Sequence, residues 1–492
     1  MATTELNTDR AAAQLLGEAL REVGYSERRV SDLLGDDAYE GGREEAPVGE
    51  RRLPRTPLAA VVRLLFLQLP TPARDVVEAL GRRGVDSLEA TGLAEVGADV
   101  VPHVRVLPVG NLLVASDDFP DEDHDRRPDY VAAYTPTSRL LDSLTPRRRV
   151  ARALDVGTGS GVQALLSARH ARHVVATDVN QHALDYAELN AALNGFDNIE
   201  CRRGSLFEPA GDETFDLITC NAPYVVSPES KWAYRDAGFQ ADEVSERVVR
   251  GAVEHLADDG FATLLISWLA HDEDEPDERP LAWTDGIGCD SWILPIWGED
   301  PLGHAATWND HLTGQGGRFA AALDTWTEYL ARLGVRWVTE GAVVLHRRPG
   351  RNFSARVDEV DEDDLDDASD QIQRAFASRM RLAELRRRSD LLGCRLKVAA
   401  PVVLEHELEP RRGRTTVVTA AFELDEGTHS RVEASPRALE LVAALDGTAT
   451  LAERVQAAAR RLGLGDAETS RLRREVLDVS TELLELGIVD FS

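Results

Sequence analysis

Short apolar runs alternate with helical patterns through the middle of the chain. Five of these runs predict strands, at residues 153–156, 173–177, 199–203, 215–220 and 261–267. Segments rich in helix-forming residues lie between or after them, the clearest at 162–168, 180–193 and 241–256. A further predicted helix at 319–333 precedes two more predicted strands, at 335–338 and 341–346. Strands that alternate with helices in this way predict βαβ units, and here an α/β fold with a sheet of seven strands.

The N-terminal part of the chain follows a different pattern. Residues 1–105 are predicted to be mainly helical, because residues 11–20 are amphipathic and the apolar stretch 58–69 ends at a proline. Residues 104–115 predict a hairpin that turns at a Gly-Asn pair. We therefore expect an N-terminal helical domain over residues 1–105.

The C-terminal part also departs from the α/β pattern. Strands are expected at 396–404 and 415–422, and three helix-like segments follow from about residue 435. This last part resembles a winged-helix module, a class that binds DNA or proteins. We therefore expect a catalytic domain over residues 106–350 and a C-terminal α+β accessory region over 351–492, winged-helix-like from about 435.

An insertion is expected inside the α/β domain, at about residues 270–315. It opens with an acidic run and contains half of the chain's eight tryptophans, namely Trp283, Trp292, Trp297 and Trp308. Long turn-rich segments in compact domains are commonly functional. The tryptophans also fit a small core of their own, and both interpretations stay open at this point.

A glycine-rich turn follows the first predicted strand of the α/β domain. Its residues are Asp155, Val156, Gly157, Thr158, Gly159, Ser160 and Gly161, and a helix begins directly afterwards. Glycines at such a turn let the backbone bend sharply and let a ligand approach the chain closely. The spacing Gly-x-Gly-x-Gly differs from the Gly-x-Gly-x-x-Gly of nicotinamide enzymes. Asp178 ends the second strand, where a carboxylate can accept hydrogen bonds from both ribose hydroxyls of a nucleoside.

The fourth predicted strand ends in a corner formed by Asn221, Ala222, Pro223 and Tyr224. The side-chain carbonyl of Asn221 and the backbone carbonyl of Ala222 offer two acceptors for the hydrogens of a planar amino group. Pro223 stiffens the turn, and the Tyr224 ring can stack on a flat target. Such a corner orients a nitrogen for attack, and orientation supplies much of the rate.

The turn, the acidic residue after strand two and the corner after strand four together resemble the class I S-adenosylmethionine-dependent methyltransferases. The resemblance implies a Rossmann-like seven-stranded sheet and S-adenosyl-L-methionine as the cofactor. It implies that Asp155 lies near the methionine end, that the glycines pass beneath the cofactor, and that Asp178 holds the ribose. The implied cofactor-binding residues are Asp155, Gly157, Thr158, Gly159, Gly161, Asp178, Val179, Ser205, Leu206 and Asn221, with Ser205 and Leu206 flanking the adenine.

Within that class, the corner and the segment 134–141 resemble the protein-glutamine methyltransferases that modify peptide-chain release factors. The family's usual corner is Asn-Pro-Pro-Tyr, and this chain has Ala222 in place of the first proline. The resemblance implies methylation of a glutamine amide in a protein substrate, such as a translation release factor. Enzymes that methylate adenine or guanine amino groups of RNA or DNA share the corner, so a nucleic acid remains the alternative partner. A third interpretation is a cofactor-binding protein without turnover, which an intact corner argues against.

The composition bears on the kind of partner, the cellular compartment and metal binding. The 492 residues carry 86 Asp and Glu against 55 Lys and Arg, a net charge of -31. Such a charge is repelled by phosphate backbones and mildly favours a protein partner. Four widely spaced cysteines and the absence of an apolar leader or long apolar run predict a cytoplasmic protein without disulfides or a membrane span. No histidine or cysteine spacing predicts a metal site.

Overall fold

The computed structural model describes residues 6–7, 9–39, 45–117, 128–132, 134–228, 241–348, 350, 353–362, 365–411 and 414–492. The chain divides into two compact units. The first unit, here called the catalytic unit, comprises residues 1–141, 148–287 and 298–343. The second, the C-terminal unit, comprises residues 142–147, 288–297 and 344–492.

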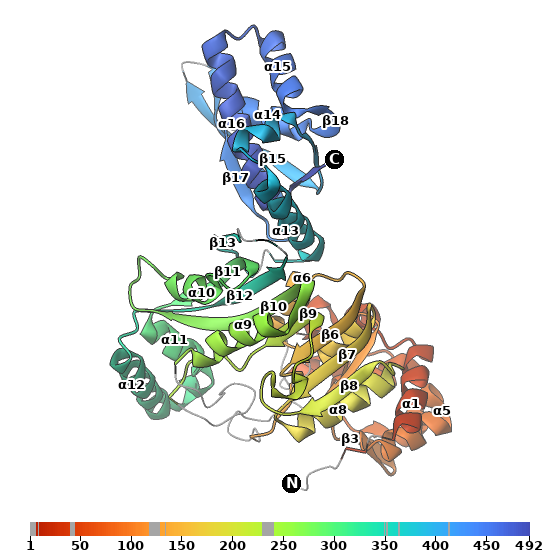
Figure 1. Ribbon diagram of the computed structural model, residues 1–492. Coiled ribbons are helices and arrows are strands. Elements are labelled where there is room, and N and C mark those ends of the chain that lie inside the picture. The colour runs from red at the N-terminus through yellow and green to blue at the C-terminus, as the bar shows by residue number, and fades with distance from the viewer. Residues whose placement is uncertain are drawn as a thin grey trace. The chain divides into compact units, whose positions relative to one another are not determined.

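A large sheet of eight strands forms the centre of the fold (Figure 1), in the order β13-β11-β12-β10-β9-β6-β7-β8. Its strands are β6 (Val150–Val156), β7 (Ala171–Asp178), β8 (Ile199–Arg203), β9 (Phe215–Asn221), β10 (Leu256–Ala270), β11 (Cys289–Glu299), β12 (Trp337–Arg347) and β13 (Ala355–Val357). Neighbouring strands from β10 through β9, β6 and β7 to β8 pair in parallel. The five strands predicted for this part of the chain are therefore confirmed.

Helices follow the strands of this sheet as the apolar spacing predicts. They are α6 (Pro136–Leu144), α7 (Val162–Ala168), α8 (Gln181–Leu193), α9 (Glu243–His255), α10 (Glu278–Thr284), α11 (Pro301–Thr307) and α12 (Gly316–Arg332). Short 3-10 turns lie at η5 (Glu208–Ala210) and η6 (Asp310–Gln315). Helix α7 packs against β6 and β7, and α8 against β7 and β8. Every residue of α7 is buried, as expected for a helix enclosed by the sheet and its neighbours.

The sheet differs from the predicted one on the side beyond β10. The region taken as an insertion contributes β11, and the two strands predicted at 335–338 and 341–346 form the single strand β12. With β13, the sheet has eight strands instead of seven. The apolar run Trp292–Leu294 is fully buried, so its burial outweighs the polar turns around it. Gly341 does not break β12, because glycine can adopt extended backbone as well as turns.

The N-terminal part of the catalytic unit is mainly helical, as predicted. Its elements are α1 (Arg10–Glu22), α2 (Glu27–Leu34), η1 (Asp36–Tyr39), α3 (Ala46–Arg52), α4 (Pro57–Val61), the π-helical turn η3 (Val62–Phe66), α5 (Ala73–Ala90), and the short strands β1 (Thr71–Pro72), β2 (Ala94–Val96) and β3 (Asp99–Pro102). The predicted hairpin is present as β4 (Arg105–Val109) and β5 (Leu112–Ser116). Gly17 lets α1 approach the end of α8, because a Cβ there would lie 2.0 Å from the Leu193 carbonyl oxygen. The helices thus share one apolar core with α8.

The C-terminal unit combines two small antiparallel sheets, β18-β14-β19 and β15-β16-β17, with four helices. Its elements are α13 (Ser369–Glu384), η7 (Arg388–Gly393), β14 (Arg395–Val398), β15 (Val402–Arg411), β16 (Arg414–Leu424), β17 (Arg431–Ala434), α14 (Pro436–Ala443), β18 (Asp446–Thr450), α15 (Leu451–Leu462), α16 (Asp466–Glu485) and β19 (Val489–Phe491). The strand predicted at 396–404 is two strands, since Pro401 lies at the break and has no N–H to donate. The three predicted helices after residue 435 are confirmed, while the winged-helix likeness and the domain boundaries stay predictions.

Among the described residues, no helix has both the length and the apolar character that a membrane crossing requires. Nor do the described residues contain a group of three or more His, Cys, Asp or Glu side chains arranged to hold a metal ion.

Candidate active site

The glycine turn lies at the carboxyl end of β6 and has the backbone that its glycines predict. Gly157, Gly159 and Gly161 have φ values of 68°, 54° and 84°, all in the left-handed region that favours glycine. A Cβ at Gly161 would lie 3.0 Å from Ala187 of α8, so this glycine serves helix packing. A Cβ at Gly159 would meet no atom within 4 Å. Open space above Gly159 is what a backbone that cradles a ligand needs.

Asp155 is buried at the end of β6 and is held by two hydroxyl groups. The Thr158 hydroxyl donates to Asp155 Oδ2 at 2.6 Å, and the Thr219 hydroxyl of β9 donates to Asp155 Oδ1 at 2.9 Å. Burial raises the pKa of Asp155 to about 6, and the hydroxyl hydrogen bonds oppose that rise. Asp155 also accepts a backbone hydrogen bond from Ala164, yet its pKa stays raised, and a buried carboxylate of this kind favours a nearby positive charge.

Asp178 lies at the end of β7, directly beside the glycine turn. Its Oδ2 accepts a hydrogen bond from the Gly159 backbone N–H at 3.0 Å, and its Oδ1 accepts one from the Asn180 N–H at 2.8 Å. Burial raises the pKa of this carboxyl above its usual value. The Val179 backbone N–H is a third backbone donor. A carboxylate has about four lone-pair sites, so acceptor capacity remains for a hydroxyl donor.

The residues predicted to flank the adenine come together where β7 and β8 end. Asp178 pairs with Arg203 in the sheet, and the Arg203 Nε donates to the Val179 carbonyl at 3.1 Å. Val179 keeps 49% of its side chain exposed. Ser205 directly precedes Leu206, whose φ of 48° is uncommon for a residue with a branched side chain. This edge therefore combines an exposed apolar side chain with a fixed turn.

The Asn-Ala-Pro-Tyr corner lies next to the glycine turn. β6 and β9 are parallel neighbours, with Val156 opposite Cys220, so both strands end at the same edge of the sheet. A Cβ at Gly157 would lie 3.9 Å from the Asn221 carbonyl oxygen. The sequence predicted the turn and the corner as two motifs 60 or so residues apart, and the parallel sheet brings them into contact range.

Hydrogen bonds to distant parts of the catalytic unit hold the corner and the residues just after it. Asn221 Nδ2 donates to the Thr137 hydroxyl at 3.1 Å. The Ala222 N–H donates to the Leu265 carbonyl at 3.3 Å, and the Ser267 hydroxyl donates to the Tyr224 carbonyl at 2.6 Å. His304 Nε2 lies 3.0 Å from the Val226 carbonyl. The backbone of the corner is thereby fixed from β10 and from α11.

Two details of the corner were not visible in the sequence. The Ala222 carbonyl already accepts the Tyr224 N–H at 2.9 Å, so only its second lone pair can serve a substrate. Thr137 belongs to the segment quoted for the family resemblance, but no spacing marked it as a partner of Asn221. Ser267 and His304 likewise carry no signal, because any hydroxyl or ring N–H that the fold brings close can fill their roles.

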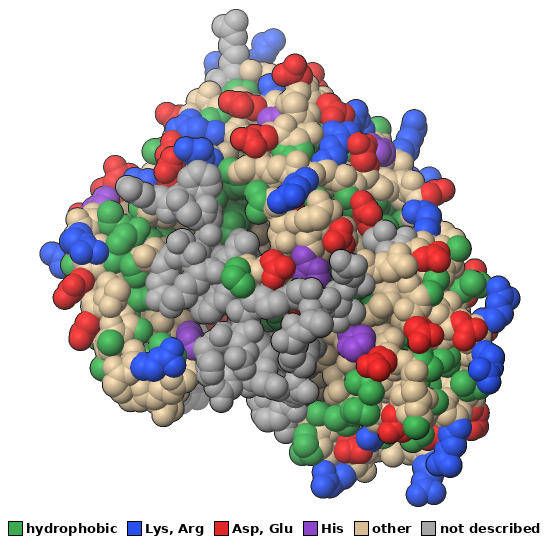
Figure 2. Space-filling view, turned by 90° about the horizontal axis from the view of Figure 1, so that it is seen from below, with side chains coloured by type: hydrophobic (Ala, Val, Ile, Leu, Met, Phe, Trp, Pro, Cys, Tyr) green, Lys and Arg blue, Asp and Glu red, His purple; other side chains and the backbone are tan. Residues whose placement is uncertain are grey.

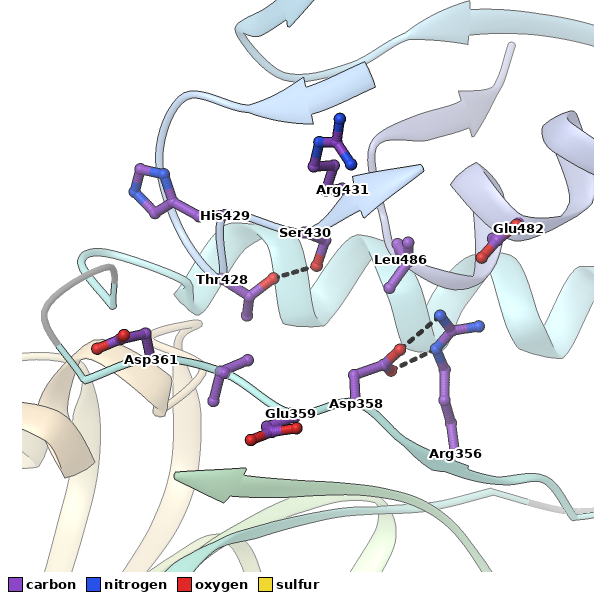
Figure 3. Close-up of a pocket in the computed structure, with 11 residues that line it drawn as sticks. Arg356, Asp358, Glu359, Asp361, Thr428, His429, Ser430, Arg431, Glu482 and Leu486 are labelled. Atoms are coloured by element: carbon purple, nitrogen blue, oxygen red, sulfur yellow. Dashed lines mark hydrogen bonds and ion pairs between the residues drawn. The ribbon is translucent and has the colours of Figure 1, made fainter. Parts of the chain in front are cut away.

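A separate cavity of about 330 Å³ lies within the C-terminal unit (Figure 3). Asp358, Glu359, Asp361 and Glu482 line it, together with Arg356 and Arg431. Arg356 is paired with Asp358 across two hydrogen bonds, as the dashed lines in Figure 3 show. None of the predicted site residues lines this cavity. Its two arginines, Arg356 and Arg431, form ion pairs with acidic residues of the same unit.

A parallel α/β sheet with a glycine turn after one strand and an Asn-x-Pro-Tyr corner after its neighbour defines a class I methyltransferase domain. Residues 134–271 match the family model described as the methyltransferase small domain. That match covers the glycine turn, Asp178 and the corner. Residues 22–106 match a domain of unknown function, DUF7059, which overlaps the N-terminal helices and the first hairpin strand.

Curated relatives are similar to the same part of the chain. The ribosomal protein uL3 glutamine methyltransferase of Bradyrhizobium diazoefficiens is 38% identical over 161 residues, which is 30% of this chain and 49% of that protein. The protein of that name from Bordetella pertussis is 33% identical over 193 residues, 35% of this chain and 63% of the relative. The release factor glutamine methyltransferase of Aliivibrio fischeri is 34% identical over 135 residues, which is 26% of this chain and 47% of that protein.

The chain thus spans between 47% and 63% of the length of these relatives. The solved structure of YcgJ from Bacillus subtilis aligns over 44% of this chain and 98% of its own, with 15% identity and a TM-score of 0.30. The family match and the geometry of the site support a methyltransferase domain over residues 134–271, which is similar to the glutamine methyltransferases named above.

Proposed function

We propose that this protein transfers a methyl group from S-adenosylmethionine to the side-chain amide nitrogen of a glutamine in another protein. The observation that carries the proposal is the position of the corner. Asn221 ends β9 beside Gly157, so the group that would hold the acceptor lies at the same sheet edge as the group that would hold the methyl donor. Catalysis at such a site depends chiefly on orientation.

The corner supplies two acceptors for the two hydrogens of a glutamine amide. These are the Asn221 side-chain carbonyl and the remaining lone pair of the Ala222 carbonyl. An amide nitrogen is a poor nucleophile because its lone pair is shared with the carbonyl, so holding both hydrogens fixes the lone pair toward the methyl group. Tyr224 is 6% exposed, and its aromatic ring would bound the site and stack on the flat amide. The nitrogen would bond to the methyl carbon as the carbon–sulfur bond of the donor breaks, the donor would leave as a neutral thioether, and one amide proton would pass to water.

The residues of the glycine turn fit a cofactor with a cationic sulfur and a ribose. S-adenosylmethionine supplies an electrophilic methyl group on that sulfur when it is bound. Gly159 leaves open space for it, the Asp178 oxygens can accept the ribose hydroxyls, and the buried Asp155 carboxylate favours the positive charge. Gly157, Thr158 and Gly161 form the turn, and Val179, Ser205 and Leu206 would border the adenine.

A protein acceptor is favoured over a nucleic acid by charge and by the relatives. The net charge of -31 opposes a phosphate backbone. Figure 2 shows acidic and basic side chains mixed over the described part of one face, without a continuous basic field. The names of the similar proteins specify ribosomal protein uL3 and release factors as methylated at glutamine. We therefore propose a translation protein of one of these two kinds as the acceptor.

The proposal is tested with purified protein and S-adenosylmethionine labelled in the methyl group. We expect label in a protein fraction that resists nuclease and is lost with protease, and mass spectrometry should place the methyl group on a glutamine nitrogen. Purified uL3 and release factors from the same cells are the first acceptors to assay. Label that follows RNA or DNA would contradict the proposal and favour methylation of a base amino group.

A further inference from the structure

A chain of hydroxyl groups leads from the start of α6 to the side chain of Asn221. Asn221 Nδ2 lies 3.1 Å from Thr137 Oγ1, and Thr137 Oγ1 lies 2.9 Å from Thr135 Oγ1. Thr135 Oγ1 in turn lies 3.0 Å from Ser138 Oγ and accepts the Ser138 backbone N–H at 3.2 Å. All of these residues belong to the described part of the catalytic unit.

The hydrogen bonds between these hydroxyl groups can all point the same way, each hydroxyl donating to the next. If the Thr137 hydroxyl donates to Thr135 and the Thr135 hydroxyl donates to Ser138, the Thr137 oxygen accepts from Asn221. In that arrangement the side-chain nitrogen of Asn221 has a hydrogen-bond partner, and its side-chain oxygen does not receive one from Thr137. The orientation of an asparagine side chain is set by such neighbours, because its nitrogen and oxygen ends have the same shape. Hydrogen bonds in a chain also strengthen one another.

We infer that Thr137 is a positioning residue, which holds Asn221 with its carbonyl oxygen available to the acceptor amide. The inference rests on the proposed function and deepens it. Among the described residues, no hydrogen bond is formed to the Asn221 side-chain oxygen, whereas its nitrogen is used by Thr137. In the flipped orientation the corner would present an N–H to the N–H of a glutamine amide, and the acceptor could not be held.

The start of α6 is itself anchored to the cofactor half of the site. Gln163, in the first turn of α7, donates from Nε2 to the Ser138 carbonyl at 2.8 Å, and Gln163 is buried. Helix α7 begins directly after Gly161 of the glycine turn. Thr137 therefore connects the helix that follows the cofactor turn with the residue that orients the acceptor.

The test compares Thr137→Val, which keeps the shape but loses the hydroxyl, with Thr137→Ser, which keeps the hydroxyl. We expect T137V to lower kcat about 10- to 100-fold, the scale of a misplaced reacting group, and T137S to recover the rate. The dissociation constant for S-adenosylmethionine should be the same in both variants and the wild type. A purely structural role would lower stability or cofactor affinity, and T137S would share the defect in proportion to its lost methyl group.

A second measurement follows the side-chain amide of Asn221 without turnover. Its proton signals, assigned by their loss in Asn221→Ala, should exchange with solvent faster in T137V than in the wild type and T137S. Equal exchange rates, or a T137V enzyme with wild-type kcat, would overturn the inference and leave the proposed function intact. Methylation of a nucleic acid would instead contradict the proposed function. The rates of T137V, T137S and the wild type would then be compared with that nucleic acid as the acceptor. If the wild type transfers no methyl group, the exchange rates alone decide.

Discussion

The two halves of the site are built in different ways. In the cofactor half, local and long-range bonds act together. Thr158 holds Asp155 from three residues away and Asn180 holds Asp178 from two, whereas Thr219 reaches Asp155 from 64 residues away. In the acceptor half, Asn221 is held by a hydroxyl 84 residues earlier, and the Tyr224 carbonyl by one 43 residues later. The cofactor half thus takes part of its geometry from adjacent residues, whereas the acceptor half depends mainly on distant ones.

This difference predicts how the two halves respond to change. A substitution in the glycine turn or at Asp178 should act mainly on cofactor affinity, because these residues would contact the cofactor. A substitution at the corner or among its distant partners should act mainly on the rate of transfer. The following predictions are ordered from the largest expected effect to the smallest.

Asn221→Ala should lower the rate of methyl transfer by about 100-fold or more, the loss seen when a preorganised polar group is removed from an active site. Binding of S-adenosylmethionine should change little, since Asn221 would hold the acceptor. Steady-state rates and calorimetric titration of the cofactor measure the two effects separately. An equal loss of cofactor affinity would mean that the two halves are not separable.

Asp178→Ala should weaken binding of S-adenosylmethionine by about 1–3 kcal/mol, the cost of leaving hydrogen-bonding groups without partners. The Gly159 N–H would also lose its acceptor, so the effect should appear as lower affinity and as a looser turn. Asp197→Ala is a matched control, because Asp197 is exposed beyond the other end of α8. Unchanged affinity in calorimetry would remove Asp178 from the cofactor site.

Cofactor affinity should depend on pH through Asp155, whose pKa burial raises to about 6. A bound cation stabilises the ionised carboxylate, so affinity should rise as pH increases through 6 and fall by up to about tenfold per unit below it. Titrations between pH 5 and pH 8 (roughly one unit below and two above that pKa) measure the slope. Asp155→Asn should bind more weakly and lose the slope; a slope that survives in this variant would assign it to another group.

Ser267→Ala should cost about 1 kcal/mol of stability, the usual net value of one hydrogen bond. It removes the donor to the Tyr224 carbonyl, so a modest loss of rate should accompany the loss of stability. Thr263→Val is the matched control on the same strand, since the Thr263 hydroxyl is buried and forms no hydrogen bond among the described residues. Urea unfolding of the two variants should differ in midpoint, and equal midpoints would mean that Ser267 does not fix the corner.

Much of the central fold could be predicted from the sequence. The apolar runs at 153–156 and 215–220 became β6 and β9, and Asn180 caps α8 as its position before the helix predicted. β11 was missed because an acidic opening and scattered tryptophans obscured an apolar strand of ordinary length. Of the tryptophans in this segment, Trp283 and Trp292 are buried, and Trp292 lies on β11 of the large sheet, so both interpretations of the segment stay predictions.

The sequence by itself determined the chemistry available at this site, while only the tertiary structure decided how it is held. Turns that need positive φ require glycine, and a rigid corner after a strand requires residues such as proline at fixed offsets, so both features leave a local pattern. The orientation of Asn221 depends instead on Thr137. Asn221 lies close to Gly157 only because β6 pairs with β9. Any hydroxyl carried there by the fold can accept an amide hydrogen, and so long-range partners of this kind leave no signature in the chain.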